Sequence, residues 1–382
     1  LNFGDLLAPP GRDELAELAE LGERLQFDDP INIQFTSGTT GNPKGATLSH
    51  HNILNNGFFV GEAIRLRAGD RVCIPVPLYH CFGMVMGNLG CLTHGATMVY
   101  PSEAFEPLAV LQAVAEERCT ASYGVPTMFI AQLDHPDFAR FDLSSLRWLV
   151  GGGERTPEER IREFGTLFPR ARYVDAYGLT ESCSGDTMME AGREIEKIGS
   201  TGRALAHVEV AILDDAGQPL AAGESGEVCL RGPKVSQGYW RDEAKTRACF
   251  VDGWFRTGDV GHLDAEGFLF LTDRKKDMII SGGENIASSE VERVLYQLPQ
   301  VTEAAVIGLP DARWGECVTA VVVLREGAGL SPEQLREHCA GKLAGFKIPR
   351  QLIIAKALPR NPSGKVLKRQ LREQYLQAPA AE

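Results

Sequence analysis

The chain has 382 residues, of which 43% are hydrophobic and 24% are charged, and its formal net charge is -12. This composition is typical of a soluble globular protein of two or three domains, and the acidic balance argues against nucleic acid as a partner. No apolar stretch reaches membrane-spanning length, and the N-terminus lacks a basic segment followed by an apolar one. We therefore expect no integral membrane segment and no secretory signal. The nine scattered cysteines form no Cys-x-x-Cys pair, which favours free thiols in a reducing cytoplasm.

Residues 1–190 alternate between helical and strand patterns. The apolar periodicity and the capping signals predict helices over 13–25, 49–64, 84–92, 107–118, 126–133 and 157–168. Short apolar runs bounded by turn residues predict strands over 71–76, 97–100, 122–125, 146–150 and 172–176. This alternation predicts an α/β domain built on a mostly parallel sheet.

The pattern changes after residue 190. Short strands separated by Asp/Gly turns, without long helices between them, are predicted over 207–213, 226–231 and 268–272. We therefore expect a β-rich subdomain over 191–275. After a charged run come two helices (288–297 and 331–343) and three strands (304–307, 318–324 and 351–354). These elements predict an α+β C-terminal domain over 277–382.

A loop rich in glycine and hydroxyl groups carries the strongest chemical signal. It follows the apolar run 31–35 and reads Thr36-Ser37-Gly38-Thr39-Thr40-Gly41-Asn42-Pro43-Lys44-Gly45. Glycine lets backbone N–H groups approach an anion closely, hydroxyls add donors, and lysine adds a positive charge. The loop therefore predicts a polyphosphate site, although the common Gly-x-x-x-x-Gly-Lys-Ser/Thr pattern is absent from the sequence.

A second motif, Tyr177-Gly178-Leu179-Thr180-Glu181, follows a predicted strand at the sheet edge where α/β proteins bind ligands. The Tyr177 ring can stack on a purine, and Thr180 and Glu181 offer hard oxygen ligands for magnesium. Taken alone, the motif fits a turn with a helix-capping threonine equally well.

Three further motifs are ambiguous when each is taken alone. In Gly253-Trp254-Phe255-Arg256-Thr257-Gly258-Asp259, the aspartate is either a ribose ligand or part of a solvated turn. The run Asp273-Arg274-Lys275-Lys276-Asp277 reads most simply as a charged face. The turn Pro359-Arg360-Asn361-Pro362-Ser363-Gly364-Lys365 presents a lysine that, in isolation, is a surface residue.

Together and in this order, the five motifs resemble the adenylate-forming acyl-CoA synthetase superfamily, which also includes luciferases and the adenylation domains of peptide synthetases. The resemblance runs from about Asp29 to the end of the chain. Ser281-Gly282-Gly283-Glu284-Asn285-Ile286 and the Lys365 motif look most like the fatty-acyl-CoA synthetases. The resemblance implies a multi-domain α/β adenylate-forming fold, with a large N-terminal domain, a β-rich subdomain and a mobile C-terminal domain hinged near Lys276.

The resemblance also implies the site residues. The phosphate contacts would be Thr36, Ser37, Gly38, Thr39, Thr40, Gly41 and Lys44. Adenine and the acyl group would lie against Tyr177, Gly178, Gly151, Gly152 and Gly153. The ribose would be bound by Asp259 and Arg274, the α-phosphate by Thr180, and magnesium by Glu181. His80 would be a gate near the acyl carboxylate, Lys365 the catalytic lysine, and Ser281, Gly282 and Gly283 part of the pantetheine tunnel.

The implied reaction is ligation of a carboxylic acid to coenzyme A through acyl-AMP, with ATP, Mg²⁺ and CoA as cofactors or co-substrates. Small and apolar residues surround the expected pocket: Phe82, Met84, Val85, Gly124, Val125, Gly151 to Gly153, Leu179, Ser182 and Cys183. They favour a medium- to long-chain fatty acid, with an aryl acid of the coumarate type as the alternative. A carrier-protein-acylating or luciferase-like activity and a homo-oligomeric state stay open.

Two departures from the family pattern bear on activity. Only 35 residues precede Thr36, whereas family members carry a far longer N-terminal portion, so a truncated protein without full activity is a further alternative. Ala287-Ser288-Ser289 stands where the family usually has an aromatic residue and a proline, which affects the expected contacts to CoA rather than adenylation.

Overall fold

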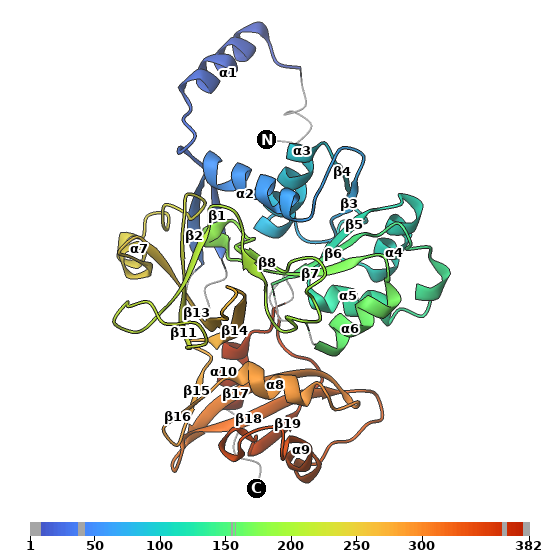
Figure 1. Cartoon of the computed structure of the whole chain (residues 1–382), viewed down its shortest axis with the longest axis vertical. Helices are drawn as coiled ribbons and strands as arrows, with labels where there is room; N and C mark the ends of the chain where they lie inside the picture. The colour runs from blue at the N-terminus through green and yellow to red at the C-terminus, as the bar shows by residue number, and fades with distance from the viewer. Residues whose placement is uncertain (1–8, 37–42, 154–155, 157, 361–364, 377–382) are drawn as a thin grey trace.

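The computed structural model of this chain describes residues 9–36, 43–153, 156, 158–360 and 365–376. Figure 1 shows a larger N-terminal domain above a smaller C-terminal domain, which is coloured orange to red. Helix α1 (Arg12–Arg24) is present where the sequence predicts a helix, but it projects from the larger domain and buries none of its residues. Among the helices described, none has the length and apolar content needed to cross a membrane.

The largest sheet has seven strands in the order β4-β3-β5-β6-β7-β8-β9. Neighbours from β4 to β7 pair in parallel, and β8 and β9 add two antiparallel pairings at one edge. The predicted mostly parallel α/β sheet is therefore confirmed. Its strands are β3 (Arg71–Cys73), β4 (Thr97–Val99), β5 (Ala121–Gly124), β6 (Trp148–Gly152), β7 (Arg172–Tyr177), β8 (Thr187–Met188) and β9 (Arg203–Ala204).

Helices cover both faces of this sheet, because successive strand residues point to opposite sides. Tyr123, Val150 and Val174 join one hydrophobic cluster, while Leu149 and Tyr173 join the other. The first cluster is closed by α2 (His50–Ala63), the π-helix η2 (Phe82–Leu89) and α3 (Gly90–His94). The second is closed by α4 (Pro107–Glu116), α5 (Pro126–Leu133) and α6 (Glu158–Leu167), with the short η3 (Phe138–Arg140) nearby in the chain.

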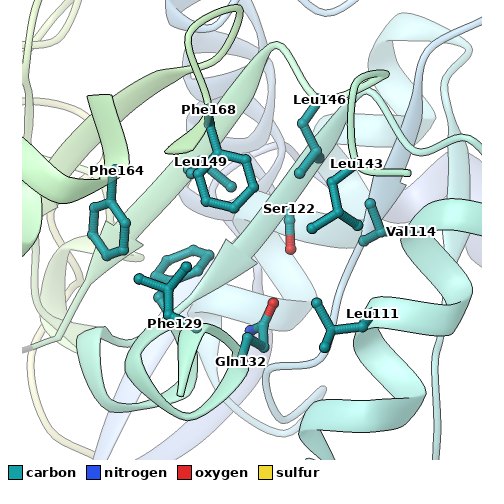
Figure 2. Close-up of a pocket in the computed structure, with 11 residues that line it drawn as sticks. Leu111, Val114, Ser122, Phe129, Gln132, Leu143, Leu146, Leu149, Phe164 and Phe168 are labelled. Atoms are coloured by element: carbon teal, nitrogen blue, oxygen red, sulfur yellow. The ribbon is translucent and has the colours of Figure 1, made fainter. Parts of the chain in front are cut away.

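The second cluster encloses a small cavity between the sheet and helices α4, α5 and α6 (Figure 2). Its lining is apolar except for Ser122 and Gln132. None of the residues that the sequence motifs single out lines this cavity. It is a packing feature of the core rather than part of the candidate site.

The end of the predicted phosphate loop belongs to a two-stranded antiparallel sheet. β1 (Pro30–Thr36) pairs with β2 (Lys44–Ser49), and Thr36 lies opposite Lys44. The sequence predicts a loop up to Gly45, whereas in the structure strand β2 begins at Lys44. Ser49 then caps α2 as predicted, since its side chain accepts a hydrogen bond from Asn52 N at 3.2 Å.

The β-rich region contains more structure than the sequence predicts. The described sheet has five strands in the order β10-β11-β13-β12, with β14 paired to β13. The elements are β10 (Glu209–Leu213), β11 (Gly226–Arg231), α7 (Glu243–Cys249), β12 (Phe250–Val251), β13 (Trp254–Leu263) and β14 (Leu269–Arg274). β13 was missed because Gly258, Asp259 and Gly261 interrupt the alternation of polar and apolar residues. In the structure Gly258 has a φ of +74°, and the register with β14 shifts between Val260 and Gly261.

The C-terminal domain is built on a five-stranded sheet in the order β16-β15-β18-β17, with β19 parallel to β18. Helices α8 and α9 cover one face of the sheet and α10 packs on the other. The elements are β15 (Ile279–Ser281), β16 (Glu284–Ile286), α8 (Ser288–Leu295), β17 (Val301–Asp311), β18 (Gly315–Leu324), α9 (Pro332–Cys339), η5 (Gly345–Lys347), β19 (Gln351–Ile354) and α10 (Lys368–Leu376). The predicted α+β composition is correct, although β15, β16 and α10 were not predicted.

Candidate functional site

The predicted phosphate loop begins and ends on paired strands. Thr36 closes β1 and Lys44 opens β2 directly opposite it, so the two ends of the loop are held together. The predicted contacts Ser37, Gly38, Thr39, Thr40 and Gly41 lie outside the described residues. Of the predicted phosphate contacts, the structure therefore describes Thr36 and Lys44.

Glu181 lies close to the end of that loop. It sits in the short helix η4 (Thr180–Ser182), and its Oε1 accepts a hydrogen bond from the Tyr239 hydroxyl at 2.7 Å. The Lys44 ammonium lies 5.2 Å from the centroid of the same Tyr239 ring, within the range of a cation–π contact. Burial, followed by the negative charge of Glu181, raises the pKa of Tyr239 well above its usual value, so the phenol stays protonated and donates.

The turn that carries Thr180 and Glu181 is tightly packed. A Cβ at Gly178 would lie 2.3 Å from the backbone nitrogen of Gly185, so only glycine fits there. Cys183 and Ser184 have left-handed φ values of 65° and 66°, which are unfavourable for residues with a side chain. Thr180 and Glu181 are both buried at this turn. The close approach and the unusual backbone fix where the two side chains lie.

A second cluster brings together three predicted residues from three strands. The Tyr177 hydroxyl donates to Asp259 Oδ2 at 2.8 Å, and Arg274 Nε lies 2.9 Å from Asp259 Oδ1. Asp259 on β13 is the register partner of Arg274 on β14, which explains their contact. Burial and the charge of Asp259 raise the pKa of Tyr177, so this hydroxyl also remains a donor.

Lys276 is within electrostatic range of both clusters. Desolvation by the surrounding protein lowers its pKa to about 8. The positive charges of Arg274 and Lys44 also lower the pKa, whereas the negative charge of Asp277 raises it. Its side chain still has substantial solvent exposure, so water screens part of this effect. The negative charge of Glu181 helps Asp259 to raise the pKa of Arg274. Lys44, Glu181, Arg274 and Lys276 thus share one electrostatic environment.

Gly151 and Gly152 end strand β6 beside β7, and Gly153 follows them. A Cβ at Gly151 would lie 1.9 Å from the Tyr173 hydroxyl, and one at Gly152 would lie 2.9 Å from the Ala176 carbonyl oxygen. Packing against β7 therefore requires glycine at both positions, independently of any ligand. Gly153 has a φ of +87° and ends the strand.

His80 precedes η2 and is half-buried. Its Nδ1 accepts a hydrogen bond from Phe82 N at 3.1 Å, which orients the ring. Burial lowers the pKa of His80 below its usual value, so the ring is neutral at pH 7. Phe82 itself stacks on Tyr123 within the core, with ring centroids 5.5 Å apart.

Lys365 and the Ser281–Gly283 turn lie in different parts of the C-terminal domain. The bridge between Arg360 and Val366 and the bond from Leu367 N to the Pro359 carbonyl fix the segment around Lys365 on the α10 side of the sheet. Ser281 to Gly283 form the turn between β15 and β16 at the sheet edge, where Gly282 N donates to the Trp314 carbonyl at 2.7 Å. The two segments that the sequence assigns to catalysis therefore belong to the same domain but lie at different places in it: one beside α10 and the other at the edge of the sheet.

Tyr239 is the functional candidate that the sequence analysis missed. It lies in the loop after β11, where Trp240 N bonds the Gly45 carbonyl and Ala46 pairs with Tyr239. Its sequence context is an ordinary glycine-containing loop, and the nearest signal is the aromatic pair that follows Gly238. The contact with Glu181 joins residues 58 positions apart in the chain and depends on tertiary structure.

The donor set around Glu181 suits magnesium better than a softer metal. It offers the Glu181 carboxylate and the Thr180 hydroxyl, and magnesium typically binds one or two carboxylates together with substrate phosphates and water. No group of three or more His, Cys, Asp or Glu side chains within the described residues is arranged to hold a metal by itself. These residues fit a magnesium ion that binds together with a nucleotide.

Comparison with family models decides the affiliation. A model described as AMP-binding enzyme matches residues 6–240, and the model of the AMP-binding enzyme C-terminal domain matches residues 290–365. The chain belongs to the AMP-binding enzyme family. The resemblance to adenylate-forming acyl-CoA synthetases that the motifs predict is thereby confirmed.

Curated AMP-binding relatives carry related names. YngI of Bacillus subtilis, provisionally named an acyl-CoA synthetase, is 44% identical over 95% of this chain and 66% of its own length. The medium-chain acyl-CoA ligase ACSF2, mitochondrial, of Danio rerio is 41% identical over 97% of this chain and 62% of its own length. The chain thus spans somewhat less than two thirds of the length of these AMP-binding relatives.

Solved structures confirm the fold. The o-succinylbenzoate CoA synthetase MenE of Bacillus subtilis, in complex with the acyl-adenylate intermediate OSB-AMP, matches with a TM-score of 0.84 and 32% identity over 98% of this chain and 78% of MenE. A second MenE structure, in complex with ATP and a magnesium ion, has a TM-score of 0.81 and 35% identity over 91% of this chain and 70% of MenE. The predicted adenylate-forming fold, with a large N-terminal and a smaller C-terminal domain, is therefore correct.

Proposed function

We propose that this chain activates a carboxylic acid with ATP to give acyl-AMP and pyrophosphate, and then transfers the acyl group to CoA with release of AMP. The observation that carries the proposal is the contact chain Lys44–Tyr239–Glu181, which lies beside the Tyr177–Asp259–Arg274 cluster. The contact chain and the cluster together bring residues of four of the five sequence motifs to one place. The affiliation with the AMP-binding enzymes and the names of the relatives support the same reaction.

The nucleotide would lie across the two clusters. Asp259 and Arg274 would bind the ribose hydroxyls, and the purine would contact the small exposed part of the Tyr177 ring beside Gly178 and Gly151 to Gly153. Thr36, Lys44 and the loop between them would hold the β- and γ-phosphates, and Thr180 the α-phosphate. Glu181, with Oε1 engaged by Tyr239, would hold magnesium through its other oxygen. Bound there, the ion would supply positive charge to the phosphates.

The first step needs charge neutralisation rather than a base. A carboxylate is already nucleophilic at pH 7, but it must approach a polyanion. Its oxygen forms a bond to the α-phosphorus while the bond to pyrophosphate breaks. Lys365 would lie beside the carboxylate in this step and Lys44 beside the departing pyrophosphate. Removal of one preorganised group of this kind typically costs about 3–4 kcal/mol in transition-state stabilisation.

The second step needs a different arrangement of the same chain. The CoA thiol attacks the acyl carbon, and AMP leaves with the electrons of the broken bond. The Ser281, Gly282 and Gly283 turn would line the path of the pantetheine arm. Because Lys365 and this turn lie apart on the C-terminal domain, rotation near Lys276 would exchange one for the other.

For the acid, the proposal is a medium- to long-chain fatty acid. Phe82 and Val85 are packed in the core, so the half-buried Met84 is the residue of this segment that supports an alkyl group, and the name of ACSF2 refers to medium-chain substrates of that protein. Chain length is poorly determined by apolar contacts, since each buried methylene contributes only about 0.8 kcal/mol. The aryl-acid alternative is supported by the o-succinylbenzoate named for MenE.

The proposal includes a cellular location, the cytoplasm. All nine cysteines are free, and eight of them are buried, which supports a reducing compartment such as the cytoplasm. The mitochondrial designation in the ACSF2 name is a statement about that protein.

The decisive experiment is ATP–pyrophosphate exchange across a panel of fatty and aryl acids, followed by thioester formation with CoA. We expect exchange with medium- to long-chain fatty acids and thioester only when CoA is added. Exchange with aryl acids alone would favour the alternative substrate. A folded protein that exchanges pyrophosphate with none of the acids would contradict the proposed adenylation.

A Lys365→Ala variant tests the proposed role of that lysine in acyl-AMP formation. We expect loss of ATP–pyrophosphate exchange by a factor of roughly 10² to 10³, because the charge that develops in the first step is no longer neutralised. Thioester formation from supplied acyl-AMP should be spared. Equal loss in both half-reactions would refute the assignment.

A further inference from the structure

We propose that Lys234 is a positioning residue for Glu181. Its buried ammonium would fix both the turn that carries Glu181 and the loop that holds the Glu181 carboxylate. The inference rests on the proposed function, since it concerns the side chain that would bind magnesium. None of the five sequence motifs includes Lys234 or its partner Asp186.

The Lys234 ammonium is enclosed and fully satisfied. Only 6% of its side chain is exposed, and Nζ lies 3.0 Å from Asp186 Oδ1, whose side chain has no exposure. Nζ also donates to Asn56 Oδ1 at 2.8 Å and to the carbonyl oxygens of Ser184 and Gly185 at 3.1 and 2.5 Å. A buried lysine is costly unless its charge is paired and its donors are used, and both conditions are met here.

These contacts join three separate segments. Asn56 belongs to α2, Ser184 to Asp186 lie just beyond the short helix that carries Glu181, and Lys234 lies in the loop after β11. That same loop holds Glu181 at two points: Ser236 N donates to the Glu181 carbonyl at 2.7 Å, and the Tyr239 hydroxyl donates to Oε1 at 2.7 Å. Lys234 therefore anchors the loop two residues before its first contact with Glu181.

The turn after Glu181 needs such an anchor. Cys183, Ser184 and Gly185 are three consecutive residues with φ values of 65° to 66°, and two of them carry side chains. A backbone of this kind persists only where the surroundings hold it. Lys234 donates to the Gly185 carbonyl and shares the Ser184 carbonyl with Asn56 Nδ2, which also donates to the Cys183 carbonyl at 2.6 Å.

Asp186 completes the network from the other side. Its Oδ2 accepts a hydrogen bond from Ser182, the neighbour of Glu181 in η4, and its backbone N–H donates to the Tyr177 carbonyl at 2.7 Å. Burial raises the pKa of Asp186, and Lys234 opposes that shift. Loss of the lysine charge would therefore favour protonation of Asp186. In a Lys234→Met variant the carboxyl group would then be neutral, and no isolated charge would be buried.

The competing reading is that Lys234 and Asp186 merely stabilise the core. Replacement of both partners of a buried ion pair by neutral groups commonly leaves stability nearly unchanged. The informative variant is therefore the double substitution Lys234→Met with Asp186→Asn, in which the introduced side-chain amide would keep a polar group for Ser182. A matched control is Lys197→Met, which removes a lysine with 14% side-chain exposure from its ion pair with Asp264.

Two measurements test the proposal. In the protein without ligands, amide hydrogen exchange at residues 181–186 and at 236 should be at least tenfold faster in the double variant than in the wild type. In ATP–pyrophosphate exchange, the magnesium concentration for half-maximal rate should rise at least tenfold, while the KM for the acid changes less than threefold. Lys197→Met should alter neither property beyond what its melting temperature explains.

Either unchanged measurement would overturn the inference. Unaltered amide exchange in a folded double variant would show that Lys234 does not hold the turn, and this result does not depend on enzymatic activity. Faster amide exchange with unaltered magnesium dependence would show that the turn does not position Glu181 for its ligand. If the wild type exchanges no pyrophosphate, the proposed function fails, and amide exchange alone then decides whether Lys234 orders the turn.

Discussion

Tyr239 makes two different contacts through one side chain. Its hydroxyl donates to Glu181 and its ring lies under the Lys44 ammonium. A Tyr239→Phe variant removes the first contact and keeps the second. Because a hydrogen bond to a charged group contributes about 1.5–3 kcal/mol, we expect adenylation to fall roughly 10- to 100-fold, with a higher magnesium requirement. Steady-state ATP–pyrophosphate exchange at varied magnesium checks this, and Tyr239→Leu, which also removes the ring contact, should be worse. Wild-type kinetics in Tyr239→Phe would contradict the contact's importance.

His80 gives the protein a defined pH response. Its pKa in the folded state is lowered by burial, so the unfolded chain binds the proton more readily once the pH falls below about 6.5. The free energy of unfolding should therefore decrease between pH 7 and pH 5 as a result of this residue. Urea unfolding at several pH values should show a shallower decrease in His80→Phe than in the wild type. Parallel pH curves for the two proteins would count against a half-buried imidazole that is neutral in the folded state.

At the scale of elements, Ser288 connects the C-terminal domain to strand β14. Its backbone N–H and its hydroxyl donate to the same oxygen of Asp273, at 2.5 and 2.6 Å, and Lys368 Nζ donates to the hydroxyl. Ser288→Pro removes both donors but suits the first position of α8, where proline is tolerated. We expect faster limited proteolysis near residues 275–279 in this variant, and an intermediate effect in Ser288→Ala.

Ser331 provides the control for that experiment. It caps α9 through the bond to Gln334 N at 3.2 Å, far in the fold from Asp273. Ser331→Ala should lower the free energy of unfolding by about 1 kcal/mol without altering cleavage near residue 276. Equal cleavage in Ser288→Pro and the wild type would show that Asp273 does not depend on these donors to hold the domain.

Elements with a strong local pattern could be predicted from the sequence, and those without it could not. Helix α5 and strands β11 and β19 match their predictions residue for residue, since proline, glycine and apolar runs mark their ends. β13 was missed because its glycines interrupt the alternation. β15 and β16 each have three residues, too few for a periodic signal. For the candidate site, the sequence motifs single out candidate residues, whereas Tyr239 and Lys234 become candidates only through contacts between distant segments.

For the whole molecule, the central prediction concerns the hinge proposed at Lys276. The segment is held on its N-terminal side, where Lys275 N donates to the Gly258 carbonyl at 2.8 Å, and by a turn in which Asp277 N and Met278 N donate to the Arg274 carbonyl. Lys276→Pro fixes one backbone angle at the centre of this turn. We expect thioester formation to be impaired more than acyl-AMP formation, because in the proposed mechanism only the second step needs the rotated arrangement.

Lys276→Ala separates stiffness from charge. This variant removes the ammonium but leaves the backbone free, so it should retain the ratio of the two half-reactions. Single-turnover measurements of acyl-AMP and of thioester provide that ratio directly. Normal overall turnover in Lys276→Pro would rule out a hinge at this residue.

The distribution of buried and partly exposed thiols allows the proposed rotation to be measured with an attached dye. Of the nine free cysteines, eight are buried and Cys249, at the end of α7, is partly exposed. A maleimide dye applied to the native protein should therefore label position 249 first, without any engineered cysteine. An acceptor dye at an attachment site introduced on α9 would then test the proposed rotation of the C-terminal domain by energy transfer during turnover.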